Sequence, residues 1–244
     1  MTFEAHRGAV FGRKWTTSPR QYGVIAQSDV KIRLRDGITL NGNLWRPDDA
    51  GKFPVVLGVH PYHPAGQTGP IKPAAMSTAQ WRSPGQERTN ASLEAGDPMF
   101  FARRGYAHMV LNVRGSGKSE GLWNYNGPQE IEDICEAIDW LAAQPWCDGN
   151  VVMFGVSYFA RTQFFVAMRQ PKPLKALFCP WGATDLYRDV CYRGGILGYQ
   201  WPVGWSQTSL IYSNVRPRNH AKEELGDEGF KKAIAALLEE DDIK

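Results

Sequence analysis

The chain of 244 residues has no apolar run near the roughly 18 residues that a membrane-spanning helix needs. Its first 15 residues also lack the apolar core of a signal peptide. No C-x-x-C pair and no zinc-type spacing links its four cysteines, which are Cys135, Cys147, Cys179 and Cys191. These absences exclude a membrane protein and a small disulfide-stabilised domain, and we expect a reduced, cytoplasmic chain.

Neither sign of charge dominates, because 28 Lys and Arg face 25 Asp and Glu for a net charge of +3. A nucleic-acid partner is therefore not expected, nor is a membrane surface. No H-x-x-x-H or H-E-x-x-H spacing occurs among the five histidines, which are His6, His60, His63, His108 and His220. We accordingly expect no metal and no other cofactor. Hydrophobic residues make up 43% of the chain, enough for a sizeable core.

What is present is an alternation of short apolar runs with helical patterns. The dipeptide Asp36-Gly37 between two β-rich stretches predicts a hairpin. A connection over 61–96, rich in Gly, Pro, Ser and Thr, is long enough to be functional. The predicted strands are 28–35, 38–47, 54–60, 106–113, 150–156 and 174–180; the predicted helices are 97–104, 128–144, 158–169 and 218–240. The order favours a mostly parallel sheet of buried strands with helices on both faces.

Ser157 stands in Gly155-Val156-Ser157-Tyr158, between a predicted buried strand and a predicted helix. A nucleophile elbow needs this placement, since a sharp strand-to-helix turn lifts the serine hydroxyl above the sheet. The helix N-terminus behind the serine offers N–H groups to a developing oxyanion. The pattern G-x-S-x-G is only partly met, because Phe159 takes the place of its last glycine. The alternative is that Ser157 merely caps the helix, as serine often does.

Five segments together resemble the cocaine esterase and Xaa-Pro dipeptidyl-peptidase-like hydrolases (the CocE/NonD group). They are LRDGITLNGNLWRP (34–47), PVVLGVHPY (54–62), DPMFFARRGYAHMVLNVRGSGKSEG (97–121), QEIEDICEAIDWLAAQPWCDGNVVMFGVSYFA (129–160) and WGATDLYRDVCYRGG (181–195). The elbow of this family is G-x-S-Y-x-G, so Tyr158 fits and Ala160 is a mild departure. The resemblance implies an α/β-hydrolase fold in which Ser157 is the nucleophile. It also implies an oxyanion hole made by the Tyr158 N–H and the Tyr62 hydroxyl.

The resemblance also implies that the fold is incomplete in this chain. In the family, the triad acid and histidine follow a helical cap inserted after the strand that corresponds to 174–180. We expect residues 1–195 to be the N-terminal part of the hydrolase core and residues 196–244 to be the start of that cap. The chain would then lack its His and Asp, and the strand at 174–180 would be an open sheet edge prone to self-association.

A local triad of Ser157, Asp185 and His220 is the less favoured alternative. The order Ser, acid, His is permitted, but His220 opens a polar helical segment and does not follow a strand of the sheet. His60 and His63 precede the serine, so we expect them to be packing or rim residues.

Three other patterns have simpler explanations. The segment 114–119, RGSGKS, resembles a phosphate-binding loop, but position 112 is Asn and no helix begins at Lys118, so we expect a structural turn. We expect a solvated helix face at Glu130, Glu132, Asp133 and Glu136, and a core or face position for His108. Two roles stay open for four aromatic residues: they line an acyl pocket under the cap, or they are buried packing residues. These residues are Trp181, Tyr199, Trp201 and Trp205.

The sequence therefore predicts a serine hydrolase that cleaves esters, amides or short peptides through an acyl-enzyme on Ser157, with water as the second substrate. A non-catalytic binding module on the same scaffold is the alternative, and a nucleotide hydrolase is a distant third.

Overall fold

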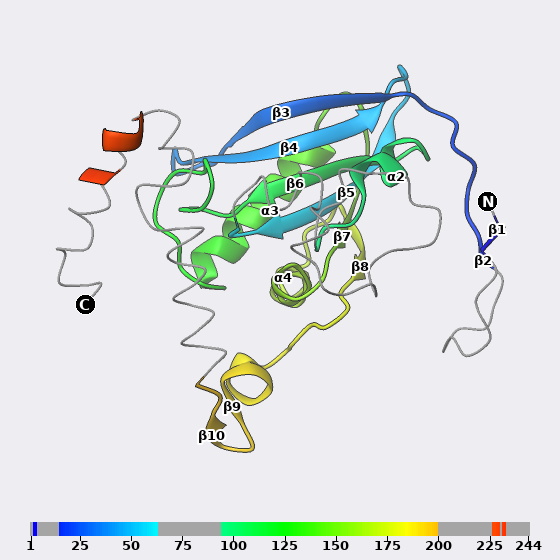
Figure 1. Ribbon diagram of the computed structural model, residues 1–244. Helices are drawn as coiled ribbons and strands as arrows, with labels where there is room; N and C mark the ends of the chain where they lie inside the picture. Colours follow the sequence, from blue (N-terminus) through cyan, green and yellow to red (C-terminus); the bar gives the residue numbers. More distant parts are fainter. Residues whose placement is uncertain (1, 4–14, 63–93, 200–225, 230, 233–244) are drawn as a thin grey trace.

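The computed structural model describes residues 2–3, 15–62, 94–199, 226–229 and 231–232. Its centre is a six-stranded sheet in the order β3-β4-β6-β5-β7-β8 (Figure 1). The strands are β3 (Val24–Arg33), β4 (Thr39–Pro47), β5 (Phe53–His60), β6 (Ala107–Asn112), β7 (Cys147–Phe154) and β8 (Leu174–Phe178). β3 and β4 are antiparallel to their neighbours, whereas β6, β5, β7 and β8 are parallel. The predicted α/β sheet is therefore confirmed.

The predicted hairpin lies between β3 and β4. Gly37 adopts a φ of 89°, and the Leu34 N–H donates to the Ile38 carbonyl over 2.8 Å. β3 begins at Val24, four residues before the predicted start at 28. A bulge between Gln27 and Val30 interrupts the β3–β4 pairing. The strand passes through a polar stretch there, and the sequence lacks the alternation of apolar and polar residues that marks a strand.

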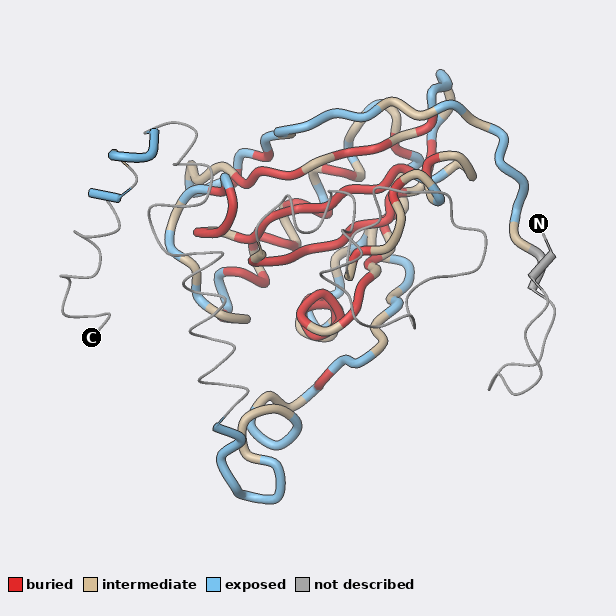
Figure 2. The backbone as a smooth tube through the Cα atoms, in the orientation of Figure 1, coloured by how far each residue is buried: buried red, intermediate tan, exposed pale blue. Residues whose placement is uncertain are grey.

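Helices cover both faces of the sheet. α3 (Pro128–Ala142) packs on the face that carries Leu57 and Met109, whereas the short α2 (Pro98–Ala102) packs on the face that carries Val110. α4 (Tyr158–Ala167) follows β7 directly and contacts α3, β5 and β7. β5 and β6 are buried along almost their whole length (Figure 2), as the continuous apolar run at 54–60 predicted.

β8 differs from its prediction as a buried strand. Among the described strands it pairs with β7 alone, and three of its five residues are exposed. It is the last strand of the sheet in the described part of the chain, and the open edge expected at this strand stays a prediction. Phe178 at its end is 56% exposed, although its ring stacks on that of Phe154 with 4.9 Å between centroids.

After β8 the chain leaves the sheet. A π-helical turn η3 (Leu186–Cys191) and the two-residue strands β9 (Tyr192–Arg193) and β10 (Ile196–Leu197) form a separate exposed segment (Figure 1). The two-residue strands β1 (Thr2–Phe3) and β2 (Trp15–Thr16) pair with each other. Of the helix predicted over 218–240, residues 226–229 and 231–232 are helical and the others lie outside the described residues. Within the described ranges, no helix has the length and apolarity that crossing a membrane requires.

Candidate active site

The turn between β7 and α4 has the geometry of a nucleophile elbow. Ser157 adopts φ 60° and ψ −113°, a conformation that costs about 1–3 kcal/mol and persists only where its surroundings enforce it. Gly155 precedes it with φ 151°, and a Cβ added there would lie 2.3 Å from the Cβ of Phe159. The sharp turn therefore requires glycine at position 155.

Neighbouring segments hold the backbone of this turn. The N–H groups of Gly155 and Val156 donate to the carbonyls of Phe178 and Glu94, both over 3.1 Å. The side-chain amide of Gln163, fully buried in α4, donates to the carbonyls of Phe159 and Phe178 over 2.9 and 3.0 Å. Strand end, helix and the end of β8 are thus tied together around the serine.

The capping alternative for Ser157 is not supported. The serine precedes the first residue of α4, but its side chain makes no capping hydrogen bond to the helix. A capping serine normally has an extended backbone, whereas the φ of Ser157 is positive. Ser157 is half-buried, so it is not one of the core residues.

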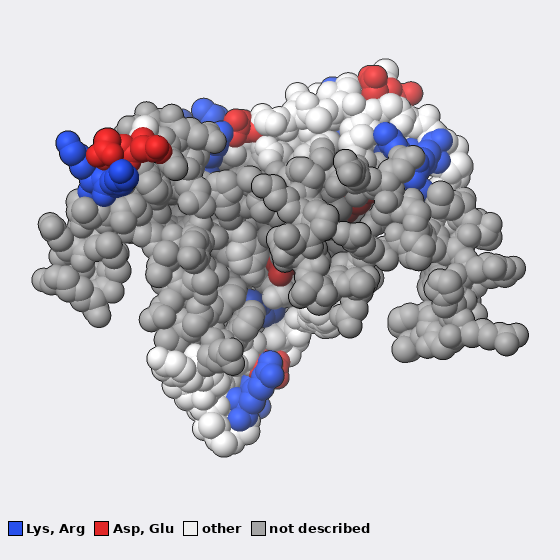
Figure 3. Space-filling model, in the orientation of Figure 1, with Lys and Arg blue, Asp and Glu red and all other residues white. Residues whose placement is uncertain are grey.

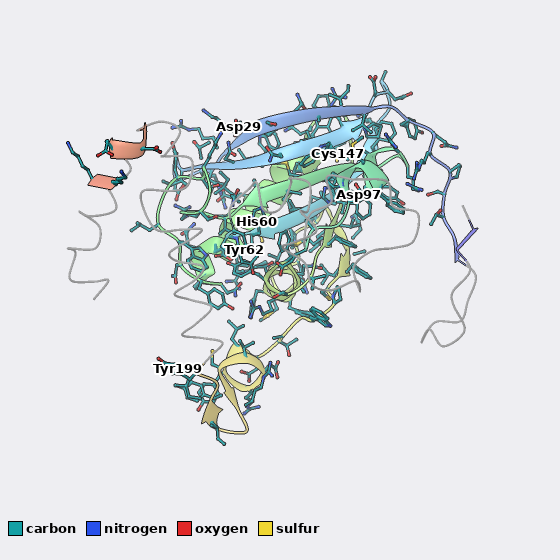
Figure 4. All side chains as sticks on the ribbon, viewed as in Figure 1. Asp29, His60, Tyr62, Asp97, Cys147 and Tyr199 are labelled. Atoms are coloured by element: carbon teal, nitrogen blue, oxygen red, sulfur yellow. The ribbon has the colours of Figure 1, made fainter. Side chains whose placement is uncertain are left out.

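Tyr62 lies beside the elbow. It follows β5 by two residues, and its backbone is fixed because its N–H donates to His60 Nδ1 over 3.1 Å and its carbonyl accepts from Asn112 Nδ2 over 2.8 Å. The Tyr62 ring lies edge-on to the Tyr158 ring, with 6.2 Å between centroids. Figure 4 shows Tyr62 and His60 together at the end of β5. The structure thus brings Tyr62 and Tyr158, the two residues predicted to bind an oxyanion, into one cluster.

The structure supports the prediction that His60 is a packing residue. It is 1% exposed, and its ring stacks on Phe159 with 5.1 Å between centroids. Its Nδ1 accepts the Tyr62 N–H, so His60 positions the Tyr62 backbone. His63 and His220 lie outside the described residues.

His108 is a core residue, one of the two placements predicted for it. It is fully buried, and its Nε2 lies 2.8 Å from the Ala95 carbonyl. Burial lowers the pKa of the imidazole to about 4, so the ring is neutral at pH 7.

Beneath the elbow, the prediction of a solvated carboxylate face on α3 is wrong for Glu130 and Asp133. They are 2% and 1% exposed. The Tyr158 hydroxyl donates to Glu130 Oε1 over 2.6 Å, and burial raises the pKa of Glu130 to about 8. Glu132 and Glu136 do lie toward the surface, where each pairs with an arginine, Arg169 and Arg35 respectively.

The segment 114–119 is a structural turn, as predicted. Both Asp133 oxygens accept hydrogen bonds of 2.7 Å from Arg114, and Asp36 accepts a third from the same guanidinium. Lys118 pairs with Asp29 at 3.0 Å. No helix starts at Lys118, because α3 begins only at Pro128, so the turn has no helix N-terminus to hold a phosphate. The structure therefore does not support the phosphate-loop alternative.

Sequence reasoning missed a second carboxyl group near the elbow. Glu94 lies at the end of the connection over 61–96, and its carbonyl accepts the Val156 N–H. Burial raises the pKa of its carboxyl to about 8, although nearby Arg161 opposes this shift. Arg161 is itself 3% exposed, and its guanidinium lies 5.9 Å from the Tyr158 ring centroid. The one sequence signal for this site is Glu94 itself, a carboxylate within a Gly- and Pro-rich stretch.

The segment after β8 begins beside the serine, because the Ser157 N–H donates to the Pro180 carbonyl over 3.4 Å. Asp185 caps η3, where its Oδ1 accepts the Arg188 N–H over 2.9 Å. Trp181 and Tyr199 are 73% and 69% exposed, which excludes buried packing, one of the two alternatives left open for them. Tyr199 also lies far from Tyr62 (Figure 4). Trp201 and Trp205 are outside the described residues.

Charges of both signs lie among the described residues of the surface (Figure 3). On the face shown in Figure 3, Lys and Arg of the described residues lie close to Asp and Glu. Several of these charges form exposed ion pairs, such as that of Lys231 with Glu228 at 2.8 Å. This mixture agrees with the small net charge of the sequence.

A mostly parallel sheet with helices on both faces and a strained serine between strand and helix defines an α/β-hydrolase fold. Residues 36–244 match the X-Pro dipeptidyl-peptidase (S15) family, and the chain belongs to this family. It is 34% identical to the cocaine esterase of Rhodococcus sp. (strain MB1 Bresler) over 200 residues, which are 80% of this chain and 31% of that protein. It is 22% identical to the Xaa-Pro dipeptidyl-peptidase of Lactobacillus helveticus (strain DPC 4571) over 204 residues, 76% of this chain and 24% of that one.

A solved structure agrees with this assignment. The crystal structure of a CocE/NonD family hydrolase from Staphylococcus aureus superposes with a TM-score of 0.68 at 31% identity, covering 88% of this chain and 36% of that one. The chain thus spans about a third or less of the length of these relatives. The predicted family and fold class are confirmed.

Proposed function

We propose that this protein is a serine hydrolase that cleaves ester or amide bonds, with Ser157 as the nucleophile. The observation that carries the proposal is the backbone of Ser157, which is held at φ 60° without the capping hydrogen bond that would give the serine a structural role. Strained residues of this kind cluster at active sites, where the strain presents a reactive group. Family membership supports the same chemistry.

In the proposed reaction, the Ser157 oxygen attacks the substrate carbonyl carbon while a base takes the hydroxyl proton. The Tyr62 hydroxyl and the Tyr158 N–H stabilise the resulting oxyanion. The bond to the leaving alcohol or amine breaks, that group takes the proton, and an acyl-enzyme remains. Water then attacks the ester carbonyl, which releases the acid and regenerates the serine.

Two features support this oxyanion site. Tyr158 is the first residue of α4, where N–H groups point out of the helix end and the helix dipole favours negative charge. The Tyr62 ring packs against the Tyr158 ring, and its backbone is fixed on both sides by His60 and Asn112. One oxyanion donor typically contributes about 3–4 kcal/mol to transition-state stabilisation.

The substrate class follows from the relatives. The names cocaine esterase and Xaa-Pro dipeptidyl-peptidase indicate small esters and short peptides, and we propose one of these classes for this chain.

We also propose that the triad acid and base lie beyond residue 244, and that 1–195 belong to the hydrolase core and 196–244 to the start of a cap. Both described histidines precede Ser157 in the chain, and both are buried in packing roles. The 244 residues alone should then show no burst of ester hydrolysis. A burst that Ser157→Ala abolishes, measured on these residues alone, would show that the base is among them.

The exposed edge at β8 supports one further part of the proposal, self-association of the 244-residue chain when it is expressed alone. Sedimentation velocity should show oligomers that Phe178→Lys reduces, since a charge on an edge strand blocks pairing. A sharp monomer boundary for the unmodified chain would contradict this part.

A fluorophosphonate probe tests the central proposal on the full-length protein. Attack by Ser157 forms an O–P bond and breaks the P–F bond, so fluoride leaves and the hydroxyl proton goes to the base. Stoichiometric labelling that maps to Ser157 and disappears in Ser157→Ala is the expected result. A folded protein that takes up no label would instead support the alternative, a non-catalytic binding module on the same scaffold.

A further inference from the structure

The buried carboxyl of Glu130 has no part in the reaction proposed above, yet it contacts a residue of the elbow. Resting on that proposed function, we infer that Glu130 is a positioning residue that fixes Tyr158 and thereby aims the oxyanion-binding N–H. The Tyr158 hydroxyl donates to Glu130 Oε1 over 2.6 Å. The same hydroxyl accepts from Trp123 Nε1 over 3.3 Å, so the phenol is bonded on two sides.

The position of Tyr158 makes this contact consequential. Its backbone follows the strained Ser157 directly, and its side chain is fully buried. The ring is enclosed by Tyr62 at 6.2 Å, Tyr125 at 5.6 Å and Trp123 at 6.4 Å between centroids. Because these contacts hold the Tyr158 ring at its hydroxyl and along its edges, they also restrain the backbone of Tyr158. The N–H of Tyr158 thus takes its direction from α3 as well as from α4.

The chemistry of Glu130 suits this role. The residue is 2% exposed, and burial raises the pKa of its carboxyl to about 8, so the group is mostly neutral at pH 7. A neutral carboxyl accepts the Tyr158 hydrogen bond without placing a negative charge beneath the site where the oxyanion develops. A glutamine at this position would keep both the acceptor oxygen and the neutral state.

A purely structural role for Glu130 makes different predictions. If the role were purely structural, substituting Glu130 would lower the folded fraction without changing the rate constant of the molecules that remain folded. If Glu130 positions Tyr158, its substitution lowers the maximal rate at which Ser157 reacts and leaves the binding of the probe unchanged. A residue of the same shape then restores the rate. Misplacement of a catalytic group by about 1 Å can lower a rate about a hundredfold.

The experiment measures the maximal labelling rate constant kinact and the half-saturating concentration KI of an alkyl fluorophosphonate on the full-length protein at pH 7. The variants are Glu130→Ala, Glu130→Gln, Tyr158→Phe and the double variant Glu130→Ala/Tyr158→Phe. The matched control is Glu132→Gln, two residues along α3, which loses only a surface pair with Arg169.

We expect Glu130→Ala and Tyr158→Phe each to lower kinact about tenfold, a change within the range that mispositioning causes, with KI unchanged. Glu130→Gln and Glu132→Gln should stay within about twofold of the wild type, and the double variant should match the single ones because both remove one interaction. If Glu130→Ala does not fold, Tyr158→Phe still tests the inference, because it keeps the ring and removes only the hydroxyl that bonds to Glu130.

Wild-type kinact in folded Glu130→Ala or Tyr158→Phe, additive losses in the double variant, or a loss in KI alone would each overturn the inference. So would a Glu130→Gln variant as slow as Glu130→Ala. Failure of the proposed function is a separate outcome, since the wild-type protein would then not be labelled at all.

Discussion

Arg114 and Asp133 form a bidentate pair in which both hydrogen bonds measure 2.7 Å, and the Asp133 side chain is 2% exposed. The pair joins the turn after β6 to α3. The same guanidinium reaches Asp36 in the β3–β4 turn, also at 2.7 Å. One side chain therefore connects three segments that lie far apart in the sequence.

We expect Asp133→Ala to lower the free energy of unfolding by about 3–5 kcal/mol, because it leaves a largely buried guanidinium without its main partner. Glu132→Ala removes a half-exposed pair with Arg169 and should cost less than about 1 kcal/mol. Denaturant titrations of both variants check this difference. Similar midpoints would show that the buried pair is not a major source of stability.

The buried carboxyl groups predict a pH dependence of stability. The pKa values of Glu130 and Glu94 are raised to about 8 in the folded protein, above their usual value of 4.5. Because the folded state holds these protons more tightly, the stabilisation is complete below about pH 4.5 and is lost as pH rises through about 8. Each group contributes a slope of up to about 1.4 kcal/mol per pH unit within this window.

Denaturant midpoints measured from pH 5 to 9 test this prediction. Glu130→Gln cannot ionise, so its midpoint should fall less steeply between pH 5 and 8 than that of the wild type. Identical slopes in the two proteins would mean that Glu130 is already ionised in the fold.

Gly155 should not tolerate a side chain. Its φ is 151°, and a Cβ would lie 2.3 Å from the Phe159 Cβ, so Gly155→Ala must displace the first turn of α4. We expect a loss of more than about 2 kcal/mol in the free energy of unfolding, in the range of strain and overpacking combined.

Gly149→Ala is the control for this substitution. Gly149 also has a positive φ, 89°, but no atom lies within 4 Å of its added Cβ. This variant should cost only the backbone strain, about 1 kcal/mol. Thermal melts that show equal losses for the two variants would contradict the tight elbow.

Gln163 holds the elbow from within α4. Gln163→Leu removes the hydrogen bonds to the carbonyls of Phe159 and Phe178, and should cost about 1–3 kcal/mol because each hydrogen bond contributes about 0.5–1.5 kcal/mol. Gln144→Leu removes one hydrogen bond to Trp140 at a half-buried position and should cost less. Hydrogen exchange of the Gly155 amide should accelerate only in the Gln163 variant; unchanged exchange would argue against this role.

The sequence predicted the sheet and the elbow because both depend on local patterns. The apolar runs that became β5 and β7, the turn residues Asp36-Gly37 and the glycine before Ser157 each act through their immediate neighbours. The burial of Glu130 and Asp133 was not predictable from the helical pattern. Their partners Tyr158 and Arg114 come from other elements, and only the packing of α3 brings them together.

β8 shows a second kind of limit. Its apolar composition is that of a buried strand, but burial depends on a further neighbour, and in the described part of the chain it pairs only with β7. Glu94 was missed because it lies in a Gly- and Pro-rich stretch. Such a stretch has no repeating hydrophobic pattern from which the burial of a single carboxylate could be predicted.

The most direct measurement is the mass of the protein quenched during turnover of a p-nitrophenyl ester. The account predicts one acyl group per molecule of full-length protein, located on the peptide that contains Ser157, and much less of it in Tyr62→Phe, which retains the ring but loses the oxyanion donor. Acylation at another residue, or hydrolysis that proceeds unchanged in Ser157→Ala, would contradict it.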